Sequence, residues 1–417
     1  MAGLVKHYQN TMKGIPQLTN NWGAMINLLD AVLVNGFNHV TILGITKANT
    51  TSITATINLG SDHGFIDRQV VRIAGSTNGW DGDYKVLSAD TSSITVECTA
   101  EHPSNILGTA SCFTAPLDFE IVYQTQSEST ESKRAYRSTD PESLGLILLV
   151  HDFCVSGASS TGAKFAKVGI VSDMSDIDTI TGSQMPFDPG IPNANWGWDG
   201  TYHGWAKWYY KTANGAVTYY ADTASPSNSG AEFYIVGDGV SFILDVKAAD
   251  TQPVYTVGGI CEFVDATYLA KNLALIAQGV QNKIAQNYSY FQQGRNPILW
   301  TSVNNSYIGK VDKNLNISLW NNDLGIQSVS NASEGWCLLK PSIGINSVTS
   351  SDTAFFSKFV ISDTNGKVRG ILPFLRISSL ATTTESFDSG VGKYVSRYYQ
   401  LASNQIFIKH VILMEQQ

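Results

Sequence analysis

Apolar and polar residues alternate along much of the chain, most clearly in residues 39–116. Single polar residues separate the apolar positions of 53–59 and of 94–98. A period of two is typical of strands with one buried and one exposed face. Glycine, asparagine and aspartate fill the turns between them, as in 60–62 and 75–83. We predict about six short strands in this stretch, forming a small antiparallel β-barrel or sandwich domain.

The first 38 residues have a different pattern and form a segment of their own. A polar stretch, which we expect to be an extended arm, leads to Pro16, and apolar residues then recur at helical spacing from Trp22 to Leu33. Further apolar residues lie off that stripe, so the helix needs cover on more than one side. Its own chain can supply all of that cover, or a neighbouring subunit can supply part of it.

Residues 117–143 contain a mostly polar run, 124–143, that ends near an Asp-Pro pair. This composition predicts a long loop or linker between domains. Three basic residues, Lys133, Arg134 and Arg137, cluster in it. They are explained by a solvated loop, or more specifically by contact with an acidic partner surface.

Residues 144–417 again contain strand-like runs separated by turn residues, which favours antiparallel sheets, in one unit or in two subdomains. One amphipathic helix is expected among them. Asp265 is a plausible cap, and apolar residues from Leu269 to Ile284 follow at intervals of four and three. The predicted fold class is therefore mainly β: an N-terminal arm and helix, a small β-barrel or sandwich domain, and a larger β-sandwich region.

Composition narrows the function classes. The 417 residues suggest two or three domains, and 15 % charged residues with 43 % hydrophobic ones are typical of a chain with a large core. A net charge of -8 argues against attraction to nucleic acid or to an anionic membrane surface. The five scattered cysteines fit reduced thiols, and the longest apolar run near the N-terminus is too short for membrane insertion. We expect synthesis in a reducing cytoplasm.

No catalytic, cofactor or metal signature stands out. The chain lacks the G-x-S-x-G and phosphate-loop motifs, and its histidines have no metal-ligand spacing. His151 and Asp152 precede a serine-rich run, but neighbours on a strand point to opposite faces. Asp173, Asp176 and Asp178 could hold calcium, but the glycine and the distal glutamate of an EF-hand loop are missing, which favours a polar turn. A glycosidase carboxylate pair stays open, since sequence gives no separation. We predict a non-enzymatic protein without cofactor or metal.

The most unusual local feature is a block of aromatic residues between positions 196 and 210. Indole and phenol rings flanked by amides and carboxylates suit sugar rings, and the same residues are favoured in cores and at protein interfaces. The block is therefore interpreted as a core or interface element, with glycan contact as the alternative. Its members are Trp196, Trp198, Tyr202, Trp205 and Trp208.

The N-terminal third contains five characteristic segments: KHYQNTMKGIPQL at 6–18, WGAMINLLDA at 22–31, DHGF at 62–65, VVRIAG at 70–75 and DGDYKV at 81–86. Together they resemble the corresponding part of a family of tailed-bacteriophage virion structural proteins. Weaker echoes follow at 120–123, 133–138, 258–263 and 369–373. The resemblance implies a subunit of a tail, baseplate or neck ring that assembles with copies of itself and with other virion proteins. The protein would reach the virion after synthesis in the bacterial cytoplasm.

The resemblance gives the N-terminal arm and helix a docking role on such a ring. The candidate interface residues are Lys6, Tyr8, Pro16, Trp22, Leu29 and Leu33. Three alternatives stay open: a glycan-binding adhesin that uses the aromatic block, a capsid decoration protein and, less favoured, a polysaccharide hydrolase.

Overall fold

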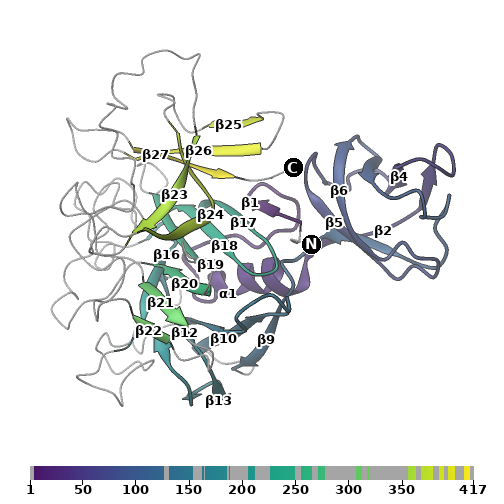
Figure 1. The fold of residues 1–417 in the computed structure, drawn as a ribbon. Coiled ribbons are helices and arrows are strands. Elements are labelled where there is room, and N and C mark those ends of the chain that lie inside the picture. Colours follow the sequence, from purple (N-terminus) through teal and green to yellow (C-terminus); the bar gives the residue numbers. More distant parts are fainter. Residues whose placement is uncertain are drawn as a thin grey trace.

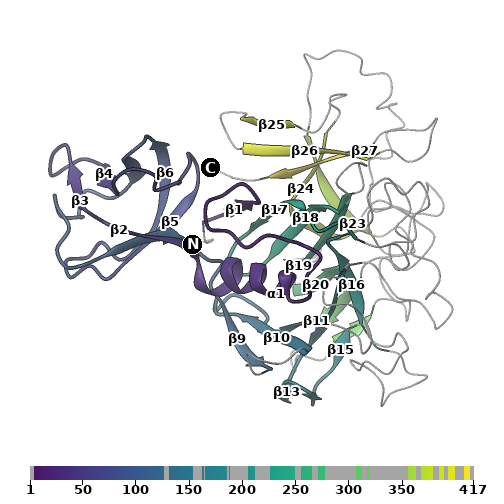
Figure 2. The same cartoon turned by 180° about the vertical axis from the view of Figure 1, so that it is seen from behind.

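The fold is known from a computed structural model and is mainly antiparallel β, with one short helical segment in the described part of the chain (Figures 1 and 2). The expected fold class is confirmed at this level. The structure describes residues 4–125, 131–153, 162–163, 165–185, 187, 205–211, 226–248, 255–264, 271–277, 307–311, 317–319, 356–362, 368–378, 385–388, 393–399 and 408–413.

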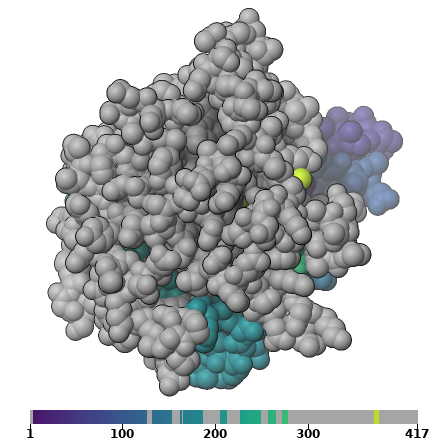
Figure 3. Space-filling view, turned by 60° about the vertical axis from the view of Figure 1, so that its left-hand side comes forward, coloured from purple at the N-terminus to yellow at the C-terminus, as the bar shows by residue number. Residues whose placement is uncertain are grey.

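One seven-stranded sheet forms a separate small domain, residues 37–114. In sheet order its strands are β2 (Phe37–Thr41), β8 (Ser111–Thr114), β5 (Val70–Ala74), β6 (Gly82–Ala89), β7 (Ser93–Glu97), β4 (Thr54–Asn58) and β3 (Gly44–Lys47). The sheet curls around a core that includes Trp80 and Val71. The sheet does not close into a barrel, because its two terminal strands, β2 and β3, do not pair with each other. These two strands are consecutive in the chain and are joined by residues 42–43. The small domain lies to one side of the described sheets of the main body in Figures 1 and 2 and is seen at the right-hand edge of Figure 3.

The rest of the described chain, called here the main body, contains three larger sheets and one small hairpin. The six-stranded sheet consists of β9 (Phe119–Gln124), β10 (Glu131–Ser138), β11 (Ile147–Phe153), β12 (Phe165–Val171), β15 (Gln184–Met185) and β16 (Ala206–Tyr209). The seven-stranded sheet consists of β1 (Lys6–Gln9), β17 (Glu232–Gly237), β18 (Phe242–Lys247), β19 (Tyr255–Val264), β20 (Lys271–Ile276), β21 (Tyr307–Val311) and β22 (Ile317–Leu319). The five-stranded sheet consists of β23 (Phe356–Ser362), β24 (Val368–Ser378), β27 (Ile408–Leu413), β26 (Lys393–Tyr399) and β25 (Glu385–Asp388), and the hairpin of β13 (Met174–Asp176) and β14 (Thr179–Ile180).

The N-terminal segment is part of the core of the main body. β1 pairs with β17 at the edge of the seven-stranded sheet, and α1 (Ala24–Leu29) continues directly into a π-helical turn, Asp30–Asn35. The helix shares one core with inward side chains of the six-stranded and the seven-stranded sheet of the main body, such as Val150 and Phe233. The cover on both sides that its apolar circumference requires therefore comes from its own chain.

The small domain is an insertion in the main body. Residues 4–36 and the chain from residue 115 onward build the main body together, while everything between them belongs to the small domain. Phe37 and Thr114, where the chain leaves and returns, are register partners on neighbouring strands. Gly36 makes the crossing at φ 69°, and a Cβ there would lie 2.5 Å from the Thr114 carbonyl oxygen. Only glycine fits this position without a shift of the backbone.

The prediction of a linker at 117–143 is wrong, because β9 and β10 occupy most of it. β10 tolerates its polar sequence because its charged side chains have partners on other elements. Arg134 and Tyr136 both bind Asp30 in the helical segment, and Arg137 pairs with Glu120 on β9. Buried polar groups with such partners cost little free energy.

The prediction of a helix from residue 265 to residue 284 is also wrong for the part of this stretch that the structure describes. Lys271–Ile276 is a strand, β20, that pairs with β19 and β21. Both of its faces are buried, so it reads as a continuous apolar run rather than as an alternation. The three-residue spacing of Leu273 and Ile276 is compatible with either structure. The remainder of the predicted helix lies outside the described residues.

Candidate functional site

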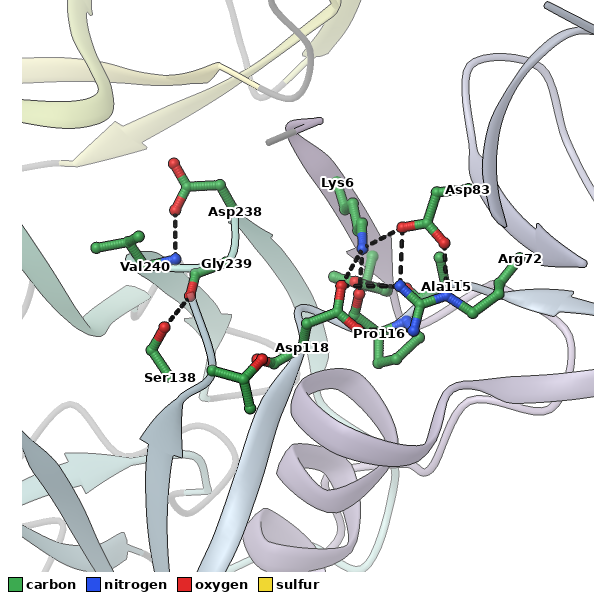
Figure 4. Close-up of polar contacts among 12 residues, drawn as sticks. Lys6, Arg72, Asp83, Ala115, Pro116, Asp118, Ser138, Asp238, Gly239 and Val240 are labelled. Carbon is green, nitrogen blue, oxygen red and sulfur yellow. Dashed lines mark hydrogen bonds and ion pairs between the residues drawn. The ribbon is translucent and has the colours of Figure 1, made fainter. Parts of the chain in front are cut away.

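Four charged side chains meet where the small domain joins the main body (Figure 4). Arg72 and Asp83 are register partners on β5 and β6 of the small domain. Asp118 lies just after the chain has returned to the main body, and Lys6 begins β1. Four separate segments thus contribute two positive and two negative groups to one cluster, which we call the charged junction.

The Arg72 guanidinium makes bidentate hydrogen bonds to both carboxylates of the charged junction. Its Nε and Nη2 lie 2.5 and 3.0 Å from the Asp83 carboxylate oxygens. Its Nη1 and Nη2 lie 2.7 and 2.8 Å from those of Asp118. A planar guanidinium that binds two carboxylates in this way restricts their direction as well as their distance.

Lys6 closes the charged junction from the main-body side. Its Nζ lies 2.7 Å from Asp83 Oδ2 and 3.2 Å from Asp118 Oδ2, and it donates to the Pro116 carbonyl oxygen. Two positions along β1, the Tyr8 hydroxyl donates to the Ala115 carbonyl oxygen at 2.7 Å. The first strand of the chain is therefore bonded to the segment through which the small domain returns.

The pKa shifts follow from this geometry. Burial alone would raise the pKa of Asp118, but hydrogen bonds and charge from Arg72 and Lys6 hold it below its ordinary value. The two aspartates raise the pKa of Arg72. Burial, followed by the charges of Asp83 and Asp118, raises the pKa of Tyr8 well above 10. Arg72 and Asp118 therefore keep their charges at neutral pH.

The six interface residues predicted for the N-terminal segment are mostly inaccessible to a partner. Lys6, Tyr8, Leu29 and Leu33 are buried, with at most 5 % of their surface exposed, and Pro16 and Trp22 are half-buried. The structure brings Lys6 and Tyr8 to the charged junction and the two leucines to the core of the main body. The segment is thus part of the fold rather than a free docking arm.

Two members of the aromatic block lie in described parts of the chain, and both are core residues. Trp208 is 2 % exposed, and its Nε1 donates to the Ile276 carbonyl oxygen at 2.7 Å. Trp205 is 1 % exposed and stacks against Phe165. Neither presents a ring for glycan contact, so the core interpretation is confirmed for these two. Trp196, Trp198 and Tyr202 lie outside the described residues.

His151 and Asp152 do not form the base and acid of a triad. Asp152 points into the core, where it accepts bonds from the Met25 amide at 2.9 Å and the Tyr210 hydroxyl at 2.7 Å. His151 stands on the opposite face of β11, in register with Lys167 on β12 and Lys133 on β10. Burial, then the charge of Lys167 and of Lys133, lowers its pKa far below the ordinary value. The serine-rich run after this pair lies outside the described residues.

The acidic residues 173–178 build turns. The Asp173 carboxylate accepts bonds from the Met174 amide and the Thr181 hydroxyl, and Asp176 accepts one from the Asp178 amide at 2.9 Å. Asp178 also pairs with Lys133. Among the residues that the structure describes, no group of three or more histidine, cysteine or acidic side chains could hold a metal ion.

Sequence reasoning did not single out Arg72, Asp83 and Asp118 as functional residues. Their one local signal is Arg72 itself, a charged residue within the apolar run Val70–Ile73. A charge at such a position predicts a specific partner, but Asp118 lies 46 residues away and Lys6 lies 112 residues from Asp118. Pairing over such separations depends on the tertiary fold.

The chain matches no known protein-family model, and it matches no curated protein sequence. No helix within the described ranges is long and apolar enough to span a membrane.

Proposed function

We propose that this chain is a non-enzymatic structural subunit of a tailed-bacteriophage virion, placed in a tail, baseplate or neck ring with copies of itself and other virion proteins. The resemblance of its N-terminal third supplies the class of protein. In this proposal the small domain, rather than the N-terminal arm, performs the docking.

The observation that carries the proposal is an inserted domain mounted on a charged junction. Partly buried ion pairs add little net stability, but directional ones favour one arrangement of the groups they join. A subunit of a closed ring needs its contact surfaces at a constant angle, since a small error per subunit prevents closure. The charged junction, together with the two chain crossings at Phe37 and Thr114, supplies such a mounting.

The distribution of exposed apolar side chains supports the same domain. Among the described large hydrophobic residues, the three most exposed are Ile53 at 68 %, Leu43 at 65 % and Leu107 at 54 %. All three lie on the small domain, although it is the smaller part of the molecule. Burial of such side chains in a contact made by this domain would contribute favourably to binding.

Two measurements test the proposal. Mass spectrometry of purified phage particles should detect the chain at a stoichiometry that fits a ring, and its absence from particles would refute a structural role. A chain in which a short glycine linker replaces residues 37–114 should fold, because Phe37 and Thr114 are strand neighbours. It should nevertheless be missing from particles, whereas uptake at the wild-type level would show that docking uses another surface.

A further inference from the structure

The far end of the small domain is built from three loops, residues 48–53, 75–81 and 98–109, which we call the distal loops. β5 begins at Val70, beside the Ala115 crossing, and ends at Ala74, where the second of these loops starts. The other two loops are bonded to it or to each other. The Thr77 amide donates to the Leu107 carbonyl oxygen, and the Cys98 amide donates to the Ile53 carbonyl oxygen.

Side chains hold the distal loops in one conformation. The Asn78 amide group donates to the Asn105 carbonyl oxygen at 2.9 Å and accepts from the Leu107 amide at 3.0 Å. The buried Trp80 indole donates to the same Asn105 carbonyl oxygen. Lys47 Nζ donates to the carbonyl oxygens of Thr99, Ala100 and His102 at 2.9, 3.2 and 3.0 Å. Loops ordered in this way lose little further entropy on binding.

The exposed surface of the distal loops carries two large apolar side chains and several carboxylates. Ile53 and Leu107 are its large exposed hydrophobic residues. Asp81 and Glu101 on the loops, and Glu97 directly before the third loop, are exposed as well. The three loops contain no lysine or arginine, and the nearby Lys47 ammonium is occupied by backbone carbonyls.

We propose that the distal loops are the surface through which the small domain docks onto a neighbouring virion protein, and that the partner presents an apolar patch surrounded by lysine and arginine. Ile53 and Leu107 would supply the buried contact, and the carboxylates of Glu97 and Glu101 would pair with the basic rim. Apolar centres with charged rims are the usual arrangement of such interfaces. This inference rests on the proposed structural function and names the surface and partner chemistry that serve it.

The test uses phage particles assembled without this subunit, to which the purified full chain is added. Uptake is measured by sedimentation and quantitative mass spectrometry. The double variant I53D/L107D should lose about tenfold or more of the uptake. L87D is the matched control, because Leu87 is also exposed on the small domain but lies toward the other end of β6. It should be taken up like the wild type, and both variants should keep the wild-type melting temperature.

The basic rim has its own readout. E97K/E101K should also reduce uptake, and wild-type uptake should fall as salt rises from about 50 to 500 mM. Equal uptake of wild type and I53D/L107D would overturn the docking surface and leave the structural function standing. An equal loss with L87D would overturn its location, and unchanged uptake of E97K/E101K would overturn the basic partner. Failure of the wild-type chain itself to enter particles would overturn the proposed function.

Discussion

Replacing Arg72 with methionine should loosen the small domain, because it removes the cation that holds two carboxylates of the charged junction. The Arg72 side chain is 28 % exposed, and those of Asp83 and Asp118 are 18 % and 41 % exposed. Breaking a fully buried pair costs roughly 3–5 kcal/mol, and breaking an exposed one costs about 0–1 kcal/mol. For this partly exposed network, with Lys6 still in place, we expect a loss of about 2 kcal/mol.

Hydrogen exchange followed by mass spectrometry measures this loss locally. Peptides from β5 and β6 should exchange about 30-fold faster in R72M, which corresponds to 2 kcal/mol. The exchange rate of R72K should lie between those of the wild type and R72M, because lysine keeps the charge but lacks the planar guanidinium that reaches both carboxylates. Since the pKa of Asp118 is lowered in the folded state, its contribution is present above its ordinary pKa near 3.8 and disappears as the pH falls below it. The difference between wild type and R72M should therefore shrink below about pH 4.

K13M is the matched control for this measurement. Lys13 pairs with Asp62 across the same two parts of the molecule, but the two side chains are 45 % and 87 % exposed. An exposed pair contributes about 0–1 kcal/mol, so exchange in β5 and β6 should change little. Equal exchange rates in R72M and K13M would refute the argument that the charged junction holds the small domain.

Three further predictions concern the main body. Deletion of residues 1–18 should give an insoluble or protease-sensitive chain, because this segment is buried in the core. Tyr8→Ala alone should lower the free energy of unfolding in urea by about 3–5 kcal/mol. A truncated chain that is soluble and unfolds cooperatively would contradict the burial of this segment. Burial raises the pKa of Asp152 from 3.8 to about 6, so the ionised form is penalised in the folded state, and the free energy of unfolding should fall by about 2 kcal/mol between pH 4 and 6. D152N should lack this pH dependence, and an unchanged slope would assign it to another group. Trp208→Phe should cost about 1–3 kcal/mol in the same urea assay by leaving the Ile276 carbonyl oxygen without its donor, and a neutral result would exclude that bond as a stabilising contact.

Strands β4 and β7 of the small domain could be predicted from sequence because each has one buried and one exposed face. In 53–59 and 94–98 the alternation of side chains matches the alternation of burial. β10 could not be predicted, because its polar residues are satisfied by groups elsewhere in the fold. Arg134 and Tyr136 reach Asp30, which lies more than 100 residues earlier in the chain. Local patterns do not contain such partners.

Long-range partners also decide how much of the candidate site could be predicted from the sequence. The apolar circumference of the N-terminal helix indicates cover on several sides, and it leaves open whether the chain itself or a neighbour supplies it. The sheets on both sides of α1 decide that question in favour of the chain itself. The charged junction depends on pairing between Lys6, Arg72, Asp83 and Asp118, which becomes visible only once the small domain is seen as an insertion.

The most direct test of the structural role is a cryo-electron microscopy map of intact phage particles with this chain located in it. We expect a symmetric ring of subunits, with the small domain of each in contact with a neighbouring protein and held at one constant angle to its main body. A map that accounts for every virion protein and contains no such subunit would contradict the proposal. A ring in which the small domains point into solvent would contradict their docking role.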